Sequence, residues 1–298
     1  MVHNEVQEKN GRKYYYRVKS VRTGKKVRKE RIYLGVNLSK AYLEKKEKEA
    51  DKKLNIFDVI LTKDEEEFLR KVKKEFSKEP IENYENRYEA FCSLFTYDST
   101  GIEGNTFTLS ETSHLLFDGI VPKEKSLREI HEVINHKKAF DFILNYKEDI
   151  TKEFILELHR LVIANTLRQD LISQSGRYRT VQVFAGRSIP PNPSEVPNQM
   201  AKLLKWHTIN KKKLHPLVLS SYFHIEFERI HPFIDGNGRV GRLLMNFILY
   251  KNKFPMINIP KKRKFKYYEV LQNAQYKNNL QGFVRFLISI LKKEKLRF

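Results

Sequence analysis

Apolar residues recur at helical spacing along most of the chain beyond residue 60. Apolar side chains three and four positions apart predict a run of helices. A further helix begins at Thr62, because the Thr-x-x-Glu pattern that it forms with Glu65 is typical of a helix N-terminus. Residues 38–53 are rich in Lys, Glu and Ala without a strong apolar stripe, which indicates a linking helix. The other predicted helices span residues 81–98, 109–117, 126–146, 151–168, 195–209, 215–230, 238–253, 264–278 and 281–295.

Strand-like alternation is found in two places. Basic residues alternate with Tyr, Val and Ile on both sides of Thr23-Gly24-Lys25-Lys26, which predicts a β-hairpin. Residues 178–189 form the second place, where Ala185-Gly186-Arg187 separates two short apolar segments and Pro190 and Pro191 follow. We interpret this segment as another hairpin inside a mainly α-helical protein.

Charge adds a candidate function for the first hairpin. The chain has 298 residues and a formal net charge of +21. Ten basic residues stand between Arg12 and Arg31 against one acid, Glu30, and they alternate with aromatic and β-branched residues. This pattern fits a nucleic-acid-binding surface, and it also fits a solvated hairpin that keeps the protein soluble. Both interpretations stay open, with the solvated hairpin favoured.

Cysteine usage and hydropathy bear on the compartment. The single cysteine, Cys92, cannot form an internal disulfide, which indicates a reducing compartment. No segment reaches the roughly 18 apolar residues of a membrane span, and the first ten residues lack an apolar signal region. We therefore expect a cytoplasmic protein without membrane contact.

The segment from His231 to Arg242 carries the clearest chemistry. Pro232 is expected to end the preceding helix, and Gly236 and Gly238 let backbone N–H groups point at one spot where the next helix begins. A helix N-terminus of this kind binds anions. His231 can accept a hydroxyl proton, and a carboxylate such as Asp235 can hold a hard divalent cation. The segment reads His-Pro-Phe-Ile-Asp-Gly-Asn-Gly-Arg-Val-Gly-Arg, and Arg239 and Arg242 would face one side of the new helix.

The segment also fits two other patterns. Residues 236–241 spell G-x-G-x-x-G, the dinucleotide-binding fingerprint, but that fingerprint needs a preceding strand, and residues 217–230 read as a buried helix. His224, His231 and Asp235 would make a three-residue transition-metal site. A histidine in an aromatic helix, such as His224, is more often a packed core residue.

The segment resembles the motif of the Fic family, His-x-Phe-x-Asp/Glu-Gly-Asn-Gly-Arg-x-x-Arg, with every fixed position filled. The resemblance covers roughly residues 60–295 and implies a Fic-fold helical bundle. It implies that the hairpin near residue 180 is a flap, whose residues Thr180, Val181, Gln182 and Val183 bind a target segment by strand addition. It also implies an adenine site at Tyr268 and Gln275, although Gln275 stands where the family is expected to have Asn. We divide the chain into a basic N-terminal part, residues 1–53, a helical region, 54–125, and the Fic core, 126–298.

A second family signature, Ser/Thr-x-x-x-Glu-Gly/Asn, is matched by Ser99-Thr100-Gly101-Ile102-Glu103-Gly104-Asn105. In Fic proteins that carry this signature, a short helix presents the glutamate to the second motif arginine. The resemblance therefore implies that Glu103 pairs with Arg242. Such a pair would remove the cation meant for the γ-phosphate and inhibit the enzyme.

The implied activity is transfer of AMP from ATP to a Ser, Thr or Tyr hydroxyl of an unknown protein. In this scheme His231 is the base and Asp235 holds Mg²⁺. Asn237 and the N–H groups near Gly236 and Gly238 seat the phosphates, while Arg239 and Arg242 neutralise the leaving pyrophosphate. Removal of AMP with Glu103 positioning a water is the nearest alternative. The sequence also leaves open the transfer of phosphate, UMP or phosphocholine. It leaves open a nucleic-acid-binding regulator whose Fic core is secondary, and a homo-oligomer.

Overall fold

A computed structural model describes residues 2–23, 26–55, 60–184, 189–293 and 298. Contacts within it divide the chain into two compact units, residues 1–62 and 63–298. Our further division of the second unit after residue 125 stays a prediction.

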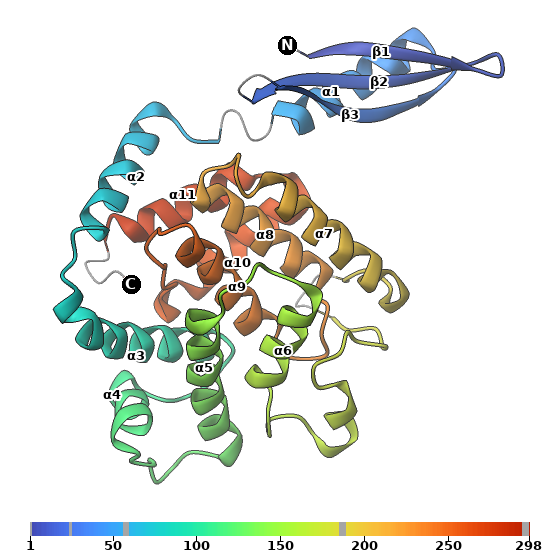
Figure 1. Ribbon diagram of the computed structural model, residues 1–298. Helices are drawn as coiled ribbons and strands as arrows, with labels where there is room; N and C mark the ends of the chain where they lie inside the picture. Colours follow the sequence, from blue (N-terminus) through green and yellow to red (C-terminus); the bar gives the residue numbers. More distant parts are fainter. Residues whose placement is uncertain (1, 24–25, 56–59, 185–188, 294–297) are drawn as a thin grey trace. The chain divides into compact units, whose positions relative to one another are not determined.

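The first unit is a three-stranded antiparallel sheet with one helix (Figure 1). Strands β2 (Arg12–Thr23) and β3 (Lys26–Val36) form the hairpin that the sequence predicts, although its turn residues 24–25 lie outside the described residues. The strand β1 (Val2–Lys9) was not predicted. It pairs with β2 through a tight turn at Asn10 and Gly11, both of which have positive φ angles. Polar residues fill most of β1, so hydropathy gave no strand signal there.

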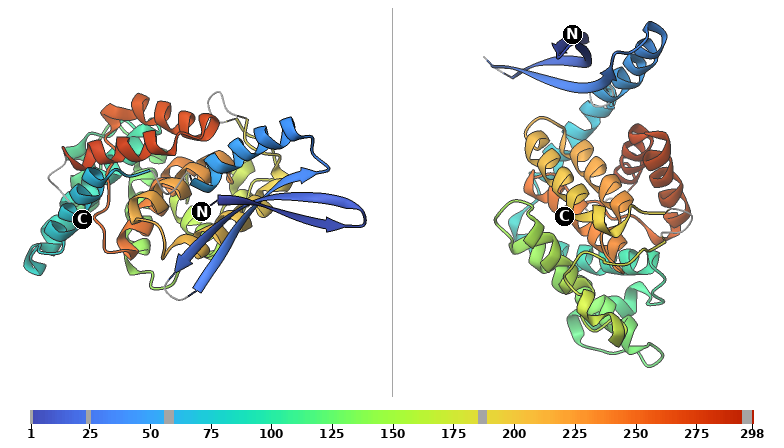
Figure 2. Two further views of the ribbon diagram at one scale, coloured as in Figure 1. Left: turned by 90° about the horizontal axis from the view of Figure 1, so that it is seen from above. Right: turned by 90° about the vertical axis from the view of Figure 1, so that its right-hand side faces the viewer.

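Helix α1 (Lys40–Asn55) runs along the sheet (Figure 2) and covers one of its faces. Arg17 donates to Asp51 of this helix at 2.7 Å, and Asn4 donates to Glu47 at 2.5 Å. The register places Asn4, Arg17 and Ile32 side by side across the sheet. The face with Arg17 therefore packs on α1, which removes Arg17 from the open face.

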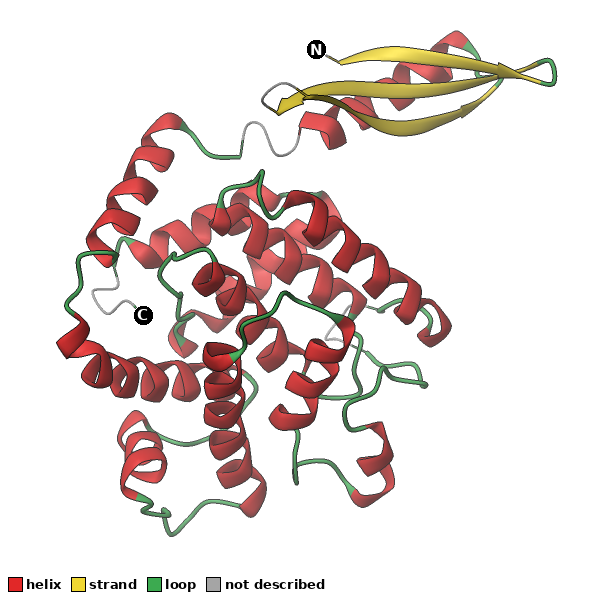
Figure 3. Ribbon diagram, viewed as in Figure 1, coloured by secondary structure: helices red, strands yellow, loops and turns green. Residues whose placement is uncertain are grey.

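The second unit is helical, and the strands in the described parts of the chain all belong to the first unit (Figure 3). Most predicted helices are present within a few residues of the expected bounds. The π-helical turn His114–Asp118 continues α4. The helices are α2 (Lys63–Phe76), α3 (Tyr84–Ile102), α4 (Leu109–Ser113), α5 (Leu127–Asn145), α6 (Lys152–Val162), α7 (Val196–Asn210), α8 (Pro216–Ile230), α9 (Asn237–Lys251), α10 (Lys264–Lys277) and α11 (Leu280–Leu291).

Helices α8 and α9 form the centre of this unit (Figure 1). Helix α8 contacts α7, α9, α10 and α11, and α9 also contacts α3, α5 and α6. Their inward side chains, such as Phe223, Phe227, Leu243 and Phe247, are almost completely buried. Because a core packed this tightly tolerates few shifts, it fixes the loop between α8 and α9, where the motif lies.

Two predicted helices end earlier than expected. The helix predicted over residues 151–168 ends at Val162, because the side chains of Asn135 and Thr166 bind the carbonyl oxygens that follow. Asn165 has a positive φ angle, which also stops the helix. The last helix ends at Leu291 instead of 295, and residues 294–297 lie outside the described part.

The predicted flap hairpin is not present as strands in its described residues, 178–184 and 189. Its expected turn, residues 185–188, lies outside them. The side chain of Arg179 donates to the carbonyl oxygens of Val181 and Pro191, and Gln182 donates to that of Pro190. Side chains thus bind carbonyl groups that a hairpin would use for cross-strand bonds.

Among the described residues, no helix is both long enough and apolar enough to cross a membrane.

Candidate functional site

The motif loop connects α8 to α9. His231 follows the last residue of α8 in a left-handed conformation with φ of 49°, and Gly236 has φ of 79° immediately before α9. A Cβ at Gly236 would lie 2.8 Å from Cγ2 of Ile163, so a side chain does not fit there. The side-chain amide of Asn237 donates to the carbonyl oxygen of Phe233 at 2.8 Å and accepts from the N–H of Phe233 at 2.9 Å. Asn237 therefore fixes the loop, and its backbone N–H at the helix start is the group left for an anion.

His231 lies in a position suited to a base. Its carbonyl oxygen accepts a hydrogen bond from Arg179 at 2.8 Å, and its Nδ1 lies 3.9 Å from Oε2 of Glu228. Burial lowers the pKa of His231 below its ordinary value, and the nearby Arg179 guanidinium acts in the same direction. The imidazole is therefore neutral at neutral pH and can accept a proton.

Arg242 is held by the segment that the second signature marks. Its side chain is 1 % exposed, and its Nη2 donates to Oε1 of Glu103 and to the carbonyl oxygen of Ser99, at 2.8 and 2.7 Å. Its Nε donates to Oγ of Ser99 at 3.0 Å. The structure thus brings together the two residues that the resemblance pairs, and it adds Ser99 as a third member.

Gly238 makes room for this ion pair. A Cβ built on Gly238 would lie 2.2 Å from Oε1 of Glu103 and 3.0 Å from Nη1 of Arg242. Gly238 lies inside α9 with an ordinary helical backbone, so the lack of a side chain matters here for space. The first turn of α9 can therefore approach either the Glu103 carboxylate or an anion that replaces it.

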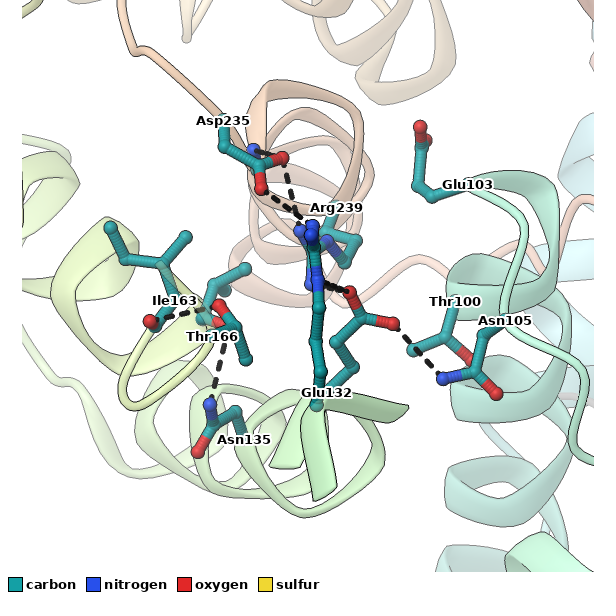
Figure 4. Close-up of polar contacts among 12 residues, drawn as sticks. Thr100, Glu103, Asn105, Glu132, Asn135, Ile163, Thr166, Asp235 and Arg239 are labelled. Atoms are coloured by element: carbon teal, nitrogen blue, oxygen red, sulfur yellow. Dashed lines mark hydrogen bonds and ion pairs between the residues drawn. The ribbon is translucent and has the colours of Figure 1, made fainter. Parts of the chain in front are cut away.

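Asp235 and Arg239 form a separate charged group (Figure 4). Nη2 of Arg239 lies 3.3 Å from Oδ1 of Asp235, and its Nη1 lies 3.6 Å from Oε1 of Glu132. Arg128 donates to Oδ2 of Asp235 at 3.1 Å and to Glu132 at 3.3 Å. The two motif arginines, predicted to face one side, therefore contact different acids: Arg239 binds Asp235 and Glu132, and Arg242 binds Glu103.

His159 is a further residue at this loop that the sequence did not identify. Its ring stacks on Phe233 with centroids 3.7 Å apart. Its Nδ1 accepts from the Gly176 N–H at 3.1 Å, so its Nε2 carries the proton and donates to the Asp235 carbonyl oxygen at 3.1 Å. Burial lowers the pKa of His159 to about 4, which keeps this arrangement neutral. His159 thereby links the start of the expected flap to the motif loop.

A cavity of about 690 Å³ adjoins these groups. His231, Gly238, Arg242 and Glu103 line one part of it, and α10 lines another. The predicted adenine residues Tyr268 and Gln275 both lie in its wall. This volume is within the range of roughly 300–1,000 Å³ that small-molecule sites have.

Glu228 also lines the cavity, and the sequence gave no reason to select it. It is almost completely buried, and burial raises its pKa to about 8. Burial thus favours the protonated form of Glu228. In the sequence, only the position of Glu228 three residues before His231 could have indicated that it lies at the site.

The expected flap residues Thr180, Val181, Gln182 and Val183 are not among the residues that line the cavity, whereas residues just after them are. Ile189, Pro190 and Pro191 line it. Val181 is half exposed and Val183 is partly buried, while Thr180 accepts a hydrogen bond from Gln174 at 3.2 Å. Gln182 binds carbonyl oxygens of Val183 and Pro190, so its side chain holds the segment itself.

The three-residue transition-metal site is not formed. His224 is completely buried, and its Nε2 is 2.8 Å from the hydroxyl of Tyr267. Within the described ranges, no group of three or more His, Cys, Asp or Glu side chains could hold a metal ion. His224 is thus a core residue with a hydrogen-bond partner.

Comparisons with known proteins agree on one family. The Fic/DOC family profile matches residues 149–249. The protein adenylyltransferase Fic of Drosophila persimilis is 38% identical over 201 residues, which cover 66% of this chain and 39% of that protein. The chain thus spans about two fifths of the length of this curated relative.

Solved structures give the same result over a larger share of the chain. A Fic-domain-containing signalling protein from Bacteroides thetaiotaomicron has a TM-score of 0.69 and 28% identity, covering 76% of this chain and 93% of that one. A Fic family protein from Desulfovibrio desulfuricans has a TM-score of 0.62 and 30% identity, covering 76% and 71%. Together with the complete motif between α8 and α9, these matches show that the chain belongs to the Fic family.

Proposed function

We propose that this protein transfers AMP from ATP to a hydroxyl group of a protein substrate. One observation carries the proposal: a neutral, buried His231 and the Arg242 guanidinium line the same cavity as the start of α9. A base, an anion-binding helix terminus and a buried cation are the groups that nucleotidyl transfer requires. The curated relatives of similar sequence are named protein adenylyltransferases, which supports the same chemistry.

In the proposed reaction, His231 takes the proton of the attacking hydroxyl. The hydroxyl oxygen bonds to the α-phosphorus, and the bond from that phosphorus to the bridging oxygen of pyrophosphate breaks. N–H groups at the start of α9 hold the phosphates, and Arg242 neutralises the γ-phosphate once Glu103 has left it. Tyr268 and Gln275 would then border the adenine.

Asp235 fits the role of cation ligand. Its carboxylate is 36% exposed, and Oδ2 is bound by the exposed Arg128, which can move away. Carboxylate oxygen is the donor that Mg²⁺ prefers, and Mg²⁺ bound at Asp235 would neutralise charge on the α- and β-phosphates. His159 holds the Asp235 backbone in place for this purpose.

The target segment is proposed to bind beside the flap residues 180–183. Val181 and the strongly exposed Phe184 and Ile189 offer apolar contacts there. Backbone pairing would hold an extended peptide here, once Arg179 and Gln182 release the carbonyl oxygens of Val181 and Val183 that they bind.

Glu103 is proposed to inhibit the transfer, since its carboxylate occupies the arginine that the γ-phosphate requires. The same carboxylate is 33% exposed and lines the cavity, so it can also position a water for removal of AMP. Deadenylylation is therefore the second proposed activity of this site.

The position of the transferred label tests the proposed function. The protein is incubated with Mg²⁺ and cell extract, in parallel with ATP labelled on the α-phosphate or on the γ-phosphate. Extract without the protein is the blank, because its own kinases transfer γ-phosphate. We expect labelling above this blank from α-labelled ATP alone, because the γ-phosphate leaves in pyrophosphate. Labelling above the blank from γ-labelled ATP alone would contradict AMP transfer and indicate a kinase.

The open face of the N-terminal sheet is proposed to bind nucleic acid. The rings of Tyr16 and Tyr33 lie 5.4 Å apart on this face, and Tyr14 lies 6.4 Å from Tyr33. Arg12 and Arg31 lie on the same face by register and are exposed, and Arg31 also pairs with Glu5 of this face at 3.1 Å. Basic side chains that attract phosphates, beside rings that stack on bases, are the features of such surfaces.

Salt dependence tests this surface. Binding of a fluorescent single-stranded or duplex oligonucleotide is expected to weaken steeply with added salt and to be lost in Arg12→Gln/Arg31→Gln/Tyr33→Ala. The control Lys71→Gln/Arg168→Gln removes two exposed charges from the helical unit and should bind as the wild type does. If the oligonucleotides fail to bind at low salt, the nucleic-acid proposal is wrong.

Compartment and subunit number are inferred from the sequence. The single cysteine, Cys92, is buried in the core, and its count supports a reducing compartment, for which we propose the cytoplasm. A homo-oligomer stays a prediction.

A further inference from the structure

Two arginines and two carboxylates form a closed ring at the start of α9, in the region shown in Figure 4. We call these residues, Arg128, Glu132, Asp235 and Arg239, the charge ring. Arg128 bridges Glu132 and Asp235 from the exposed side, and Arg239 bridges the same two carboxylates from the buried side. Both oxygens of Asp235 therefore accept hydrogen bonds from arginines.

The arginines that bind both Asp235 oxygens compete with the cation that Asp235 is proposed to hold. Arg239 is 2% exposed, so it requires a counter-charge close by. If Asp235 were the only carboxylate near Arg239, the ion pair between them would be stronger, and a cation could reach Asp235 only by displacing the buried Arg239 guanidinium. Glu132 supplies a second carboxylate, whose side chain is only 11% exposed, and it shares both arginines with Asp235.

The orientation of Glu132 is fixed by the segment that follows Glu103. Asn105 is buried, and its side-chain amide donates to Oε2 of Glu132 at 3.0 Å and to the Glu129 carbonyl oxygen at 3.1 Å. Because Asn105 occupies Oε2, the other oxygen, Oε1, faces both arginines. Glu132 is thus held in place on α5, with one oxygen directed at the ring.

We propose that Glu132 is a positioning residue that draws Arg128 and Arg239 away from Asp235 and so leaves Asp235 able to bind a divalent cation. This inference rests on the proposed role of Asp235 as cation ligand. Arg128 is 57% exposed and stays bonded to Glu132 when it leaves Asp235. Arg128 is therefore the member that the cation displaces, while Arg239 stays between the two carboxylates.

Direct cation binding tests the proposal. Mn²⁺ serves as the probe, and free Mn²⁺ is measured by electron paramagnetic resonance during titration of the protein with and without ADP. Glu132→Gln removes the competing charge and should weaken Mn²⁺ binding about tenfold, which corresponds to about 1.4 kcal/mol. Arg128→Gln releases Oδ2 of Asp235 and should strengthen Mn²⁺ binding severalfold. The double variant Arg128→Gln/Glu132→Gln should return close to wild type, a recovery that a merely misfolded Glu132→Gln protein cannot show.

Glu129→Gln is the matched control. Glu129 lies one turn earlier on α5 and bonds to Thr106 and Ser126, so its loss should leave Mn²⁺ affinity unchanged. Asp235→Asn separates the two proposals. If it binds Mn²⁺ as the wild type does, the cation site itself is misplaced. If Asp235→Asn loses Mn²⁺ while Glu132→Gln and Arg128→Gln bind like wild type, Asp235 is the ligand and the positioning role of Glu132 is wrong.

Discussion

Replacement of His231 by alanine is expected to reduce AMP transfer by ~10²–10⁴-fold, the usual contribution of a general base. The structure gives the reason: the imidazole is neutral because burial lowers its pKa, and it lines the cavity beside Arg242. Initial rates of label transfer from α-labelled ATP measure the effect. Nucleotide affinity should change little, because the base acts on the attacking hydroxyl.

The pH dependence of the rate is an internal control for this prediction. The wild-type rate should hold through neutral pH and fall only below the ordinary histidine range, since the lowered pKa of His231 keeps the base neutral until then. A His231→Ala protein that transfers AMP at the wild-type rate would assign proton removal to another group.

Replacement of Glu103 by glycine is expected to raise AMP transfer about tenfold or more. The carboxylate holds a fully buried arginine at 2.8 Å, and such a charge-assisted contact is worth about 1.5–3 kcal/mol. Without it, Arg242 is free for the γ-phosphate. Gly238 leaves the space empty for that phosphate, because no side chain replaces the lost carboxylate.

Two comparisons separate inhibition from a structural effect of Glu103. Arg242→Ala in the Glu103→Gly background should lose the gain, because both the carboxylate and the phosphate need the same guanidinium. Release of AMP from previously modified protein should stop in Glu103→Gly if this carboxylate positions the water. Equal transfer and equal release in wild type and Glu103→Gly would leave Glu103 as an ordinary residue at a helix end.

The order of helices could be predicted from the sequence because their burial pattern is regular. Apolar residues of α8 and α9 repeat at helical spacing and are almost all buried, so the pattern and the packing agree. The strand β1 was missed because its residues are mostly polar, and strand formation there depends on pairing with β2. The end of α6 was missed because a side chain from a distant helix helps to determine it: Asn135 of α5 donates to the carbonyl oxygens of Val162 and Ala164.

The site residues that lie in the contiguous motif could be predicted from the sequence. The site residues that act through contacts with distant parts of the sequence could not. His231, Asp235 and Arg242 lie within twelve residues, and their chemistry is legible from their types and spacing. Glu132 and His159 act through contacts with residues about 76 to 107 positions away, which no local pattern contains. The flap differs: its alternating residues favour strands, but its described residues, 178–184 and 189, form none, and there Arg179 and Gln182 bind carbonyl oxygens of the segment.

AMP transfer at this site can be tested by intact mass spectrometry of the Glu103→Gly protein after incubation with Mg²⁺ and ATP. We expect the variant to gain the mass of AMP, the wild type to gain less, and Glu103→Gly/His231→Ala to gain none. A gain of one phosphate by the purified variant, or no AMP on the variant and none on the proteins of an added cell extract, would contradict AMP transfer at this site.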